Sequence, residues 1–213
     1  MMKLMAITNL KDIHDFCSQY RNQTISNSKI VCDATEGERL HIGLALNAPL
    51  TELKLPAGTF IIGEYWDDQS RMQARHEFLH PKNGNIEPGD LTQFSGELLG
   101  AYGAADARDF ITRAKAIGFV KYWSHNDGGF RAKYLKAYSK MPDYIDGLGG
   151  HLGFKLNNGT LVMEVWESQE AHDNAMANIM KPALNDISQS TTITARVVSL
   201  SIADDQVRYL ADL

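Results

Sequence analysis

Two stretches of the chain share one pattern of apolar and polar positions, an apolar run that passes directly into a polar, helix-like run. The first stretch lies at 58–70 and the second at 159–172. Three residues recur at a constant offset of 100: Glu64 and Glu164, Trp66 and Trp166, Gln69 and Gln169. Each stretch is typical of a β-strand that leads straight into a helix. The repetition predicts that one strand–helix unit occurs twice.

The second half of the chain predicts a full set of elements around its copy of this unit. Alternating patterns indicate strands, and apolar residues three and four apart indicate helices. The expected order is a strand at 119–123, a helix at 127–140, strands at 151–156 and 159–166, a helix at 168–181 and a strand at 190–202. Asn157-Asn158-Gly159 favours a hairpin between the two middle strands. This order is that of the ferredoxin-like split βαβ arrangement.

The first half predicts the same later elements after a less regular opening. We expect strands at 2–8, 39–46, 58–66 and 91–102, helices at 10–20 and after Asp68, and a bridging helix at 104–116. Asp67 or Asp68 can cap the helix after the repeated strand, as Ser168 can in the second copy. Pro81 and Pro182 are expected to end these two helices, since proline cannot continue a helical hydrogen-bond ladder.

These elements predict an α+β fold, with tandem ferredoxin-like repeats whose antiparallel sheets pack as an α+β barrel. The expected division is a first repeat at 1–103, a connecting helix at 104–117 and a second repeat at 118–213. The repeated glutamate and tryptophan share one strand face, and both faces are mostly apolar. A glutamate on a covered face needs a partner or a wet cavity, because burial of an unpaired charge is costly. We therefore expect the Glu–Trp face to look into a cavity between the two sheets.

Composition excludes several classes of protein. The 213 residues are 44% hydrophobic and 22% charged, as in ordinary soluble globular proteins, and no run of about 18 apolar residues would span a membrane. A formal charge of −5 argues against nucleic acid as a partner. Cys17 and Cys32 are expected as free thiols in a reducing cytoplasm. The cluster Gly147, Gly149, Gly150 and Gly153 precedes a strand, so it fails the context of a dinucleotide-binding loop.

Eight residues are candidates for chemistry in the expected cavity. The candidate catalytic residues are Glu64, Glu164, His125 and His151, and the candidate substrate-binding residues are Trp66, Trp123, Trp166 and Tyr134. Glutamate in apolar surroundings has a raised pKa and can act as a general base, and histidine moves protons near neutral pH. The alternative roles are structural: glutamates paired across the sheet, aromatic core anchors and a surface histidine. His76 and His80 are four apart, but no third ligand has suggestive spacing, so we expect no metal site.

The strand that ends in Trp166 and continues as Glu-Ser-Gln-Glu-Ala-His resembles the dimeric α+β barrel superfamily, especially its antibiotic biosynthesis monooxygenase-like family. The resemblance covers 118–202 well and 58–80 in the first half. It implies a monooxygenase that acts on a small apolar or aromatic molecule without metal or tightly bound organic cofactor. A glutamate or histidine would deprotonate the substrate, and the carbanion would react with dioxygen. In that family two chains usually build the barrel, so a homodimer stays open, whereas two repeats could build it alone.

Two other functions remain open on the same resemblance. One is a non-catalytic small-molecule binding or stress-response protein of this fold. The other is a haem-binding or haem-degrading protein, since that branch uses an asparagine of the first strand and a tryptophan and histidine of the second helix. Asn9 matches the asparagine and His80 follows Trp66 by 14 residues, but the helix lacks the tryptophan.

Overall fold

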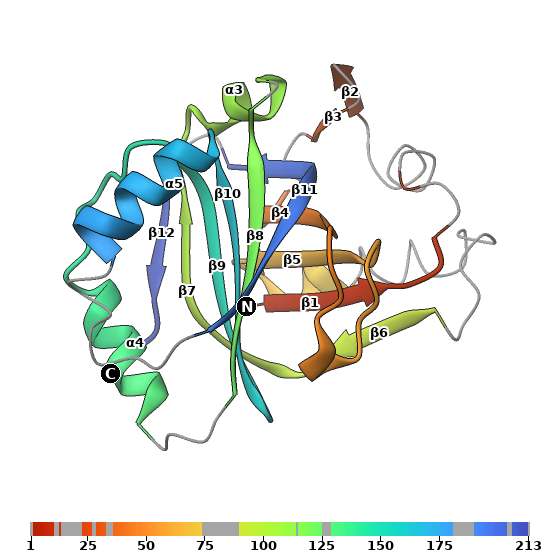
Figure 1. Ribbon diagram of the computed structural model, residues 1–213, viewed down its shortest axis with the longest axis horizontal. Helices are drawn as coiled ribbons and strands as arrows, with labels where there is room; N and C mark the ends of the chain where they lie inside the picture. Colours follow the sequence, from red (N-terminus) through yellow and green to blue (C-terminus); the bar gives the residue numbers. More distant parts are fainter. Residues whose placement is uncertain are drawn as a thin grey trace.

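The computed structural model describes residues 2–10, 13, 23–26, 29–32, 36–73, 90–113, 115–124, 129–180, 190–203 and 206–212. A large, mostly antiparallel sheet organises them (Figure 1). One set of strands comes from the first half of the chain: β1 (Met2–Ile7), β4 (Glu38–Leu46), β5 (Phe60–Trp66) and β6 (Leu91–Phe94). A second set comes from the other half: β8 (Ile117–Ser124), β9 (Leu148–Leu156), β10 (Gly159–Trp166) and β11 (Thr191–Ile202).

The two sets have the same internal order. The first runs β4-β5-β1-β6 and the second β9-β10-β8-β11. In each set, the second and third strands along the chain pair with each other. The first strand pairs with the third on its other side, and the fourth strand pairs with the first. All these neighbours are antiparallel. The α+β class with an antiparallel sheet, expected from the sequence, is confirmed.

The two sets are joined at both ends, by β11 at one end and by the strand that follows β6 at the other. In β11, Thr191–Ala195 pairs with β8 and Ala195–Ile202 pairs with β4. The chain leaving β6 continues almost at once into β7 (Gly96–Gly103), which pairs with β9. Because the sets are linked at both ends, the sheet closes into a barrel.

The interior of this barrel is filled with apolar side chains from both sets. A Cβ on Gly63 of β5 would lie 2.8 Å from Met163 Sδ of β10 and 3.1 Å from a methyl carbon of Leu152 on β9. Glu64 and Glu164 follow Gly63 and Met163, so they point to the outer face. The expected cavity between the sheets, with the glutamates facing it, is therefore wrong. Alternation showed which residues share a face, but it could not show which of two apolar faces lies inside.

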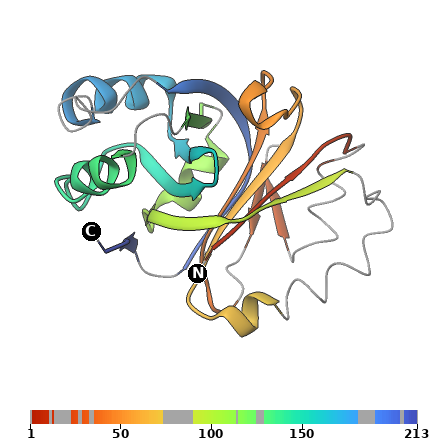
Figure 2. The ribbon, with the colours of Figure 1, turned by 90° about the horizontal axis from the view of Figure 1, so that it is seen from below.

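Helices cover the outer face of the second set. Figures 1 and 2 show α4 (Phe130–Tyr138) and α5 (Gln169–Ala175) side by side against that face. Ser168 caps α5, since its Oγ accepts a hydrogen bond from Ala171 N at 3.1 Å, and α5 continues as the π-helical turn η2 (Met176–Met180). Asp68 is the cap of the first copy, because its Oδ1 accepts from the backbone N–H of Ser70 at 2.7 Å. No described helix is long and apolar enough to cross a membrane.

Some short elements were not expected from the sequence. They are β2 (Gln23–Ser26), β3 (Lys29–Cys32), the 3-10 turn η1 (Thr51–Leu53) and β12 (Val207–Leu210). The bridging helix is shorter than expected, at α3 (Ala107–Thr112). The hairpin between β9 and β10 turns at Asn157 and Asn158 as expected. The stops at Pro81 and Pro182, and most of the expected helix at 10–20, lie outside the described residues.

Candidate functional site

A buried carboxylate at the centre of β10 organises the outer face of the second set. Glu164 is 1% exposed. Its Oε2 accepts hydrogen bonds from Lys121 Nζ at 2.7 Å and from Trp166 Nε1 at 3.0 Å. Burial alone would raise the pKa of the Glu164 carboxyl, but the Lys121 ammonium and His151 together hold it well below its usual range. Glu164 is therefore an ionised, paired carboxylate.

His151 on β9 links this carboxylate to two tyrosines of α4. Its Nδ1 lies 3.3 Å from Glu164 Oε1 and 3.0 Å from the hydroxyl of Tyr138, and its Nε2 lies 2.7 Å from the hydroxyl of Tyr134. Burial lowers the pKa of His151 despite the nearby carboxylate. Burial likewise raises the pKa of both tyrosines well above the usual value. Both ring nitrogens of this neutral histidine are thus occupied by protein partners.

A cavity of about 90 Å³ lies beside this network, between α4, α5 and the sheet. Its wall is mostly aromatic and thioether, with a few polar groups: Lys121, Trp123, Phe130, Tyr134, Tyr138, Glu164, His172, Met176, Met180, Ser190 and Thr192. Trp123 and Phe130 pack with ring centroids 5.4 Å apart. Lys121 reaches the cavity beneath Met176, whose Sδ lies 3.6 Å from Nζ. The wall therefore combines apolar rings and thioethers with a few polar groups, as is usual for small-molecule sites.

His172, one of the residues that line this cavity, has a buried ring nitrogen. The residue is 7% exposed, and its Nε2 has no hydrogen-bond partner among the described residues. Its Nδ1 lies 2.9 Å from Asp173 Oδ1. A carboxylate only accepts hydrogen bonds, so Nδ1 carries the proton and Nε2 carries the lone pair. Burial lowers the pKa of His172, although Asp173 opposes the shift, so the ring is neutral at pH 7.

The orientation of His172 is set by ring packing. Its imidazole stacks on Phe119 of β8, with centroids 3.8 Å apart and planes 15° apart. It meets the edge of Trp166 at 5.4 Å and 87°. These contacts hold the ring where the capped first turn of α5 places it. The pair Asp173–His172 is therefore an oriented imidazole and carboxylate on a helix that lines the cavity.

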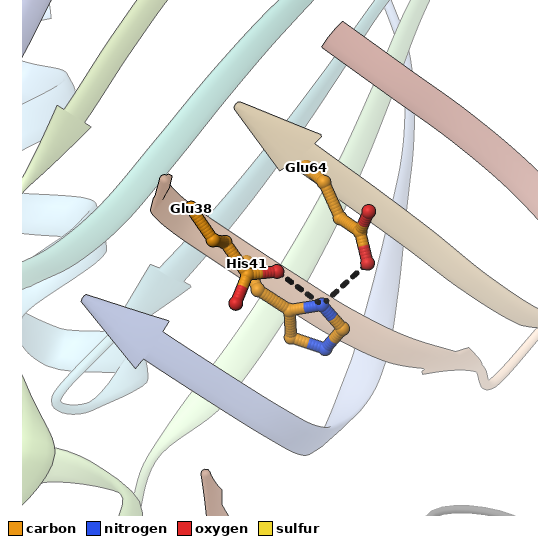
Figure 3. Close-up of side chains that lie close together, drawn as sticks. All are labelled: Glu38, His41 and Glu64. Carbon is orange, nitrogen blue, oxygen red and sulfur yellow. Dashed lines mark hydrogen bonds and ion pairs between the residues drawn. The ribbon is translucent and has the colours of Figure 1, made fainter. Parts of the chain in front are cut away.

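The first set carries a matching cluster on its own outer face. Trp66 Nε1 donates to Glu64 Oε2 at 2.9 Å, and His41 Nδ1 lies 3.3 Å from Glu64 Oε1. His41 Nε2 lies 2.7 Å from Ser199 Oγ. A second carboxylate, that of Glu38, approaches the same His41 nitrogen at 3.8 Å (Figure 3). All three ionisable groups are buried.

The structure thus divides the residues that the sequence singled out. One group gathers around the cavity and its network: Glu164, His151, Trp123, Trp166 and Tyr134. Glu64 and Trp66 belong to the separate cluster on the first set. His125, His76 and His80 lie outside the described residues.

Sequence reasoning missed Lys121, Tyr138 and His172. Lys121 shares a strand face with Trp123, and that alternation is a usable signal. His172 stands in the strand–helix motif itself, four residues after the cap Ser168. Nothing in the sequence shows that its Nε2 has no hydrogen-bond partner within the described part of the chain, because this depends on packing against β8.

Comparison with known proteins shows the fold. No protein-family model matches the sequence, and no curated protein matches it. A solved structure described as a "putative monooxygenase" from Lactobacillus acidophilus NCFM superposes with a TM-score of 0.65 at 10% identity, over 98% of each chain. Another with the same description, from Fusobacterium nucleatum, gives a TM-score of 0.68 at 10% identity, over 99% of this chain and 97% of that one. The chain therefore has the α+β fold of these monooxygenase-like proteins, which confirms the expected resemblance at the level of fold.

Proposed function

We propose that this protein is a small-molecule monooxygenase whose substrate is a single-ring, electron-rich aromatic compound bound in the cavity under α4 and α5. The observation that carries the proposal is His172, which lines an aromatic cavity and whose buried, unprotonated Nε2 has no hydrogen-bond partner among the described residues. Such a nitrogen is suited to accept a proton from the activated CH₂ group of a bound aromatic compound. Under this proposal the reaction takes place on the helix side of the sheet.

In the first step the activated CH₂ carbon of the substrate transfers one of its two protons to His172 Nε2. The Asp173 carboxylate, 2.9 Å from Nδ1, stabilises the imidazolium that forms. The low pKa that burial imposes on His172 keeps the base free at neutral pH. The substrate is left as a delocalised anion with high electron density on a ring or benzylic carbon.

Dioxygen then oxidises this anion. One electron passes to dioxygen, and the resulting superoxide and substrate radical combine to form a C–O bond. The peroxide anion takes the proton back from His172. Loss of the second proton from the same carbon breaks the O–O bond and releases water. A CH₂ carbon and O₂ thus give a carbonyl and H₂O, with all four electrons supplied by the carbon.

Lys121 is the group suited to stabilise the anion. Its ammonium is buried, lines the cavity and is held by Glu164 at 2.7 Å. A fixed positive charge beside a developing oxyanion in surroundings of low polarity lowers the barrier strongly. Glu164 is already ionised and paired, so we assign it the role of holding Lys121 rather than of removing a proton.

The size of the cavity limits the substrate. About 90 Å³ is less than the roughly 150 Å³ of an engineered cavity that binds benzene. Entry of one ring therefore requires movement of flexible side chains, and Met176 and Met180 on the π-helical turn η2 can provide it. A porphyrin does not fit this cavity, so it gives haem binding no support. The second candidate function is binding of a single-ring molecule without reaction, which the small cavity supports over haem binding.

Dioxygen uptake by the purified protein tests the proposal. We expect uptake with single-ring phenols that carry an activated CH₂ group, and ¹⁸O from ¹⁸O₂ in the carbonyl product. His172→Phe keeps an aromatic ring on Phe119 but removes the base, so kcat should fall by about 10²–10⁴-fold. Asn174→Ala, an exposed change on the same helix, is the matched control and should leave kcat unchanged.

Two results would contradict the assignment. Wild-type protein that consumes no dioxygen with any of these phenols, yet binds them in equilibrium dialysis, would be a ligand-binding protein. Full activity of His172→Phe would show that another group removes the proton.

A further inference from the structure

We propose that Glu38, His41 and Glu64 form a binding site for a divalent first-row metal ion. The three residues come from β4 and β5 and are all buried, with Glu38 2% exposed. One ligand atom from each lies within 4.8 Å of the other two. Figure 3 shows both carboxylates directed at the same nitrogen of His41. This site is separate from the cavity under α4 and α5.

The spacing of the atoms suits a metal ion better than a simple hydrogen-bonded triad. His41 Nδ1 lies 3.3 Å from Glu64 Oε1 and 3.8 Å from Glu38 Oε1. Ligands of a tetrahedral ion with bonds of about 2.0–2.1 Å lie about 3.3 Å apart. One ring nitrogen carries at most one proton and cannot donate well to two carboxylates. A cation between the three atoms could accept a lone pair from each of them after a small closure by Glu38.

Supporting hydrogen bonds orient two of the three ligands. Ser199 Oγ lies 2.7 Å from His41 Nε2, on the far side of the ring from the carboxylates. Trp66 Nε1 donates to Glu64 Oε2 at 2.9 Å, which leaves Oε1 directed at His41. Metal ligands are commonly held in this way, with the atom that does not bind the ion fixed by a neighbouring group.

The second set provides an internal comparison. His41 lies opposite Glu64 across β4 and β5, and His151 lies opposite Glu164 across β9 and β10. Next to each pair the strands are irregular, and Glu38 lies opposite Trp66 where Leu148 lies opposite Trp166. The third carboxylate is therefore particular to the first set. In the second set the hydroxyl of Tyr138 approaches the histidine nitrogen, and Lys121 neutralises the glutamate.

The donor set determines the kind of ion. Two carboxylates suit Mn²⁺, and imidazole suits Zn²⁺ and Fe²⁺, so a mixed set of this kind selects divalent first-row metals. The ligands must be deprotonated to bind, which makes loading favourable near and above neutral pH. Because the site is buried within the sheet, we expect the ion to stabilise the fold.

Titration of chelator-treated full-length protein with Zn²⁺ and with Mn²⁺ tests the site. We expect one equivalent of at least one of these ions to bind, with a rise in Tm that grows with free metal concentration. Glu38→Leu, which installs the residue of the matching position in the second set, should abolish this binding event. Ser199→Ala should weaken it by about 10–100-fold, the usual effect of removing a supporting hydrogen bond.

Two controls keep the result interpretable. Glu38→Gln preserves the shape of the side chain, so loss of metal binding by a variant with the wild-type circular dichroism spectrum supports the site. Replacement of both His76 and His80 by Asn removes the other histidine pair that the sequence offers, and metal binding should persist. The proposal is overturned if wild-type protein binds neither ion, if both Glu38 variants bind as tightly as wild type, or if the His76/His80 variant loses the ion.

Discussion

The outer faces of the two strand sets share a glutamate, a tryptophan and a histidine, but the residues around these three differ. Each has a buried glutamate, a tryptophan two residues later that donates to it, and a histidine directly opposite. The lysines differ: Lys3 lies opposite Glu64, whereas Phe119 lies opposite Glu164 and Lys121 follows two residues along the strand. This displacement lets Lys121 pair with Glu164 while His172 stacks on Phe119.

A second difference concerns the carboxylates. The second set has Leu148 where the first has Glu38, so one face holds a single neutralised carboxylate beside a cavity and the other holds two carboxylates around one imidazole. The shared Glu–Trp–His arrangement therefore fixes the strands, and the residues added to it set the chemistry. We propose a small organic molecule as the ligand of one face and a cation as the ligand of the other.

Breaking the ion pair of the second set should have the largest effect on stability. Lys121→Met removes the ammonium and leaves the Glu164 carboxylate buried without its cation, which typically costs about 3–5 kcal/mol. Urea unfolding measures the loss. Lys155→Met is the control, because Lys155 is half-exposed and its Nζ lies as far as 4.0 Å from Glu97 Oε2. Loss of this exposed ion pair should change the free energy of unfolding by less than about 1 kcal/mol. A loss of less than about 1 kcal/mol for Lys121→Met would refute a central role for the Lys121–Glu164 ion pair.

The two tryptophans allow the shared part of the clusters to be compared. Trp66→Phe and Trp166→Phe each remove a hydrogen bond to a carboxylate, of 2.9 and 3.0 Å respectively, so each should cost about 1.5–3 kcal/mol. Differential scanning calorimetry of both variants gives the comparison. Costs that differ by more than about 2 kcal/mol would mean that the two hydrogen bonds are not equivalent.

Acid should weaken the second set. The folded pKa of His151 lies below 6.5, so the unfolded chain takes up the proton first and stability falls as pH drops below about 6.5. The folded pKa of Glu164 is also lowered, so its contribution is present above about 4.5 and is lost on further acidification. Urea unfolding at pH 7.5, 5.5 and 4.0 should show the decline. Glu164→Gln should reduce the loss of stability between pH 5.5 and 4.0. An unchanged loss over this range would contradict the contribution assigned to Glu164.

Mild alkali should give the smallest effect, confined to the first set. Burial lowers the pKa of Lys3 from 10.5 to about 8, although Glu64 opposes the shift. Between these values the unfolded chain binds more protons than the folded chain, so stability should rise slightly from pH 8 to pH 9.5. This range stays below the ordinary tyrosine pKa of 10.0. Lys3→Met should remove the rise, and a rise that persists in this variant would assign it to another group.

The sequence allowed the repeated strands and their order to be predicted because alternation, a hairpin turn and two helix caps are local signals. It did not show β12, whose four residues, Val207–Leu210, are too short for a periodic pattern. It also placed the Glu–Trp face inside the barrel, since both faces are apolar and only packing distinguishes them. The glycine cluster shows a similar limit: Gly153 leaves space for the Tyr134 hydroxyl, a contact made across α4 and β9.

The candidate site was predictable only in part, for related reasons. Glu164, Trp166, Trp123 and Tyr134 stood out through the repeat or through aromatic patterning, and they do lie around the network and cavity. Glu38 and His41 were not singled out, because they meet Glu64 only through strand pairing more than 20 residues away in the sequence. The importance of His172 depends on a ring nitrogen that no described residue contacts by a hydrogen bond, which residue spacing does not reveal.

The proposed reaction depends most on the protonation state of the His172 ring, which ¹⁵N NMR of the labelled protein reports directly. At pH 7 we expect Nδ1 to be protonated and Nε2 to be bare, and we expect addition of a single-ring phenol to move the Nε2 resonance while those of His41 stay fixed. A protonated Nε2 in the free protein, or an Nε2 resonance that does not respond at saturating phenol, would contradict a base facing the cavity.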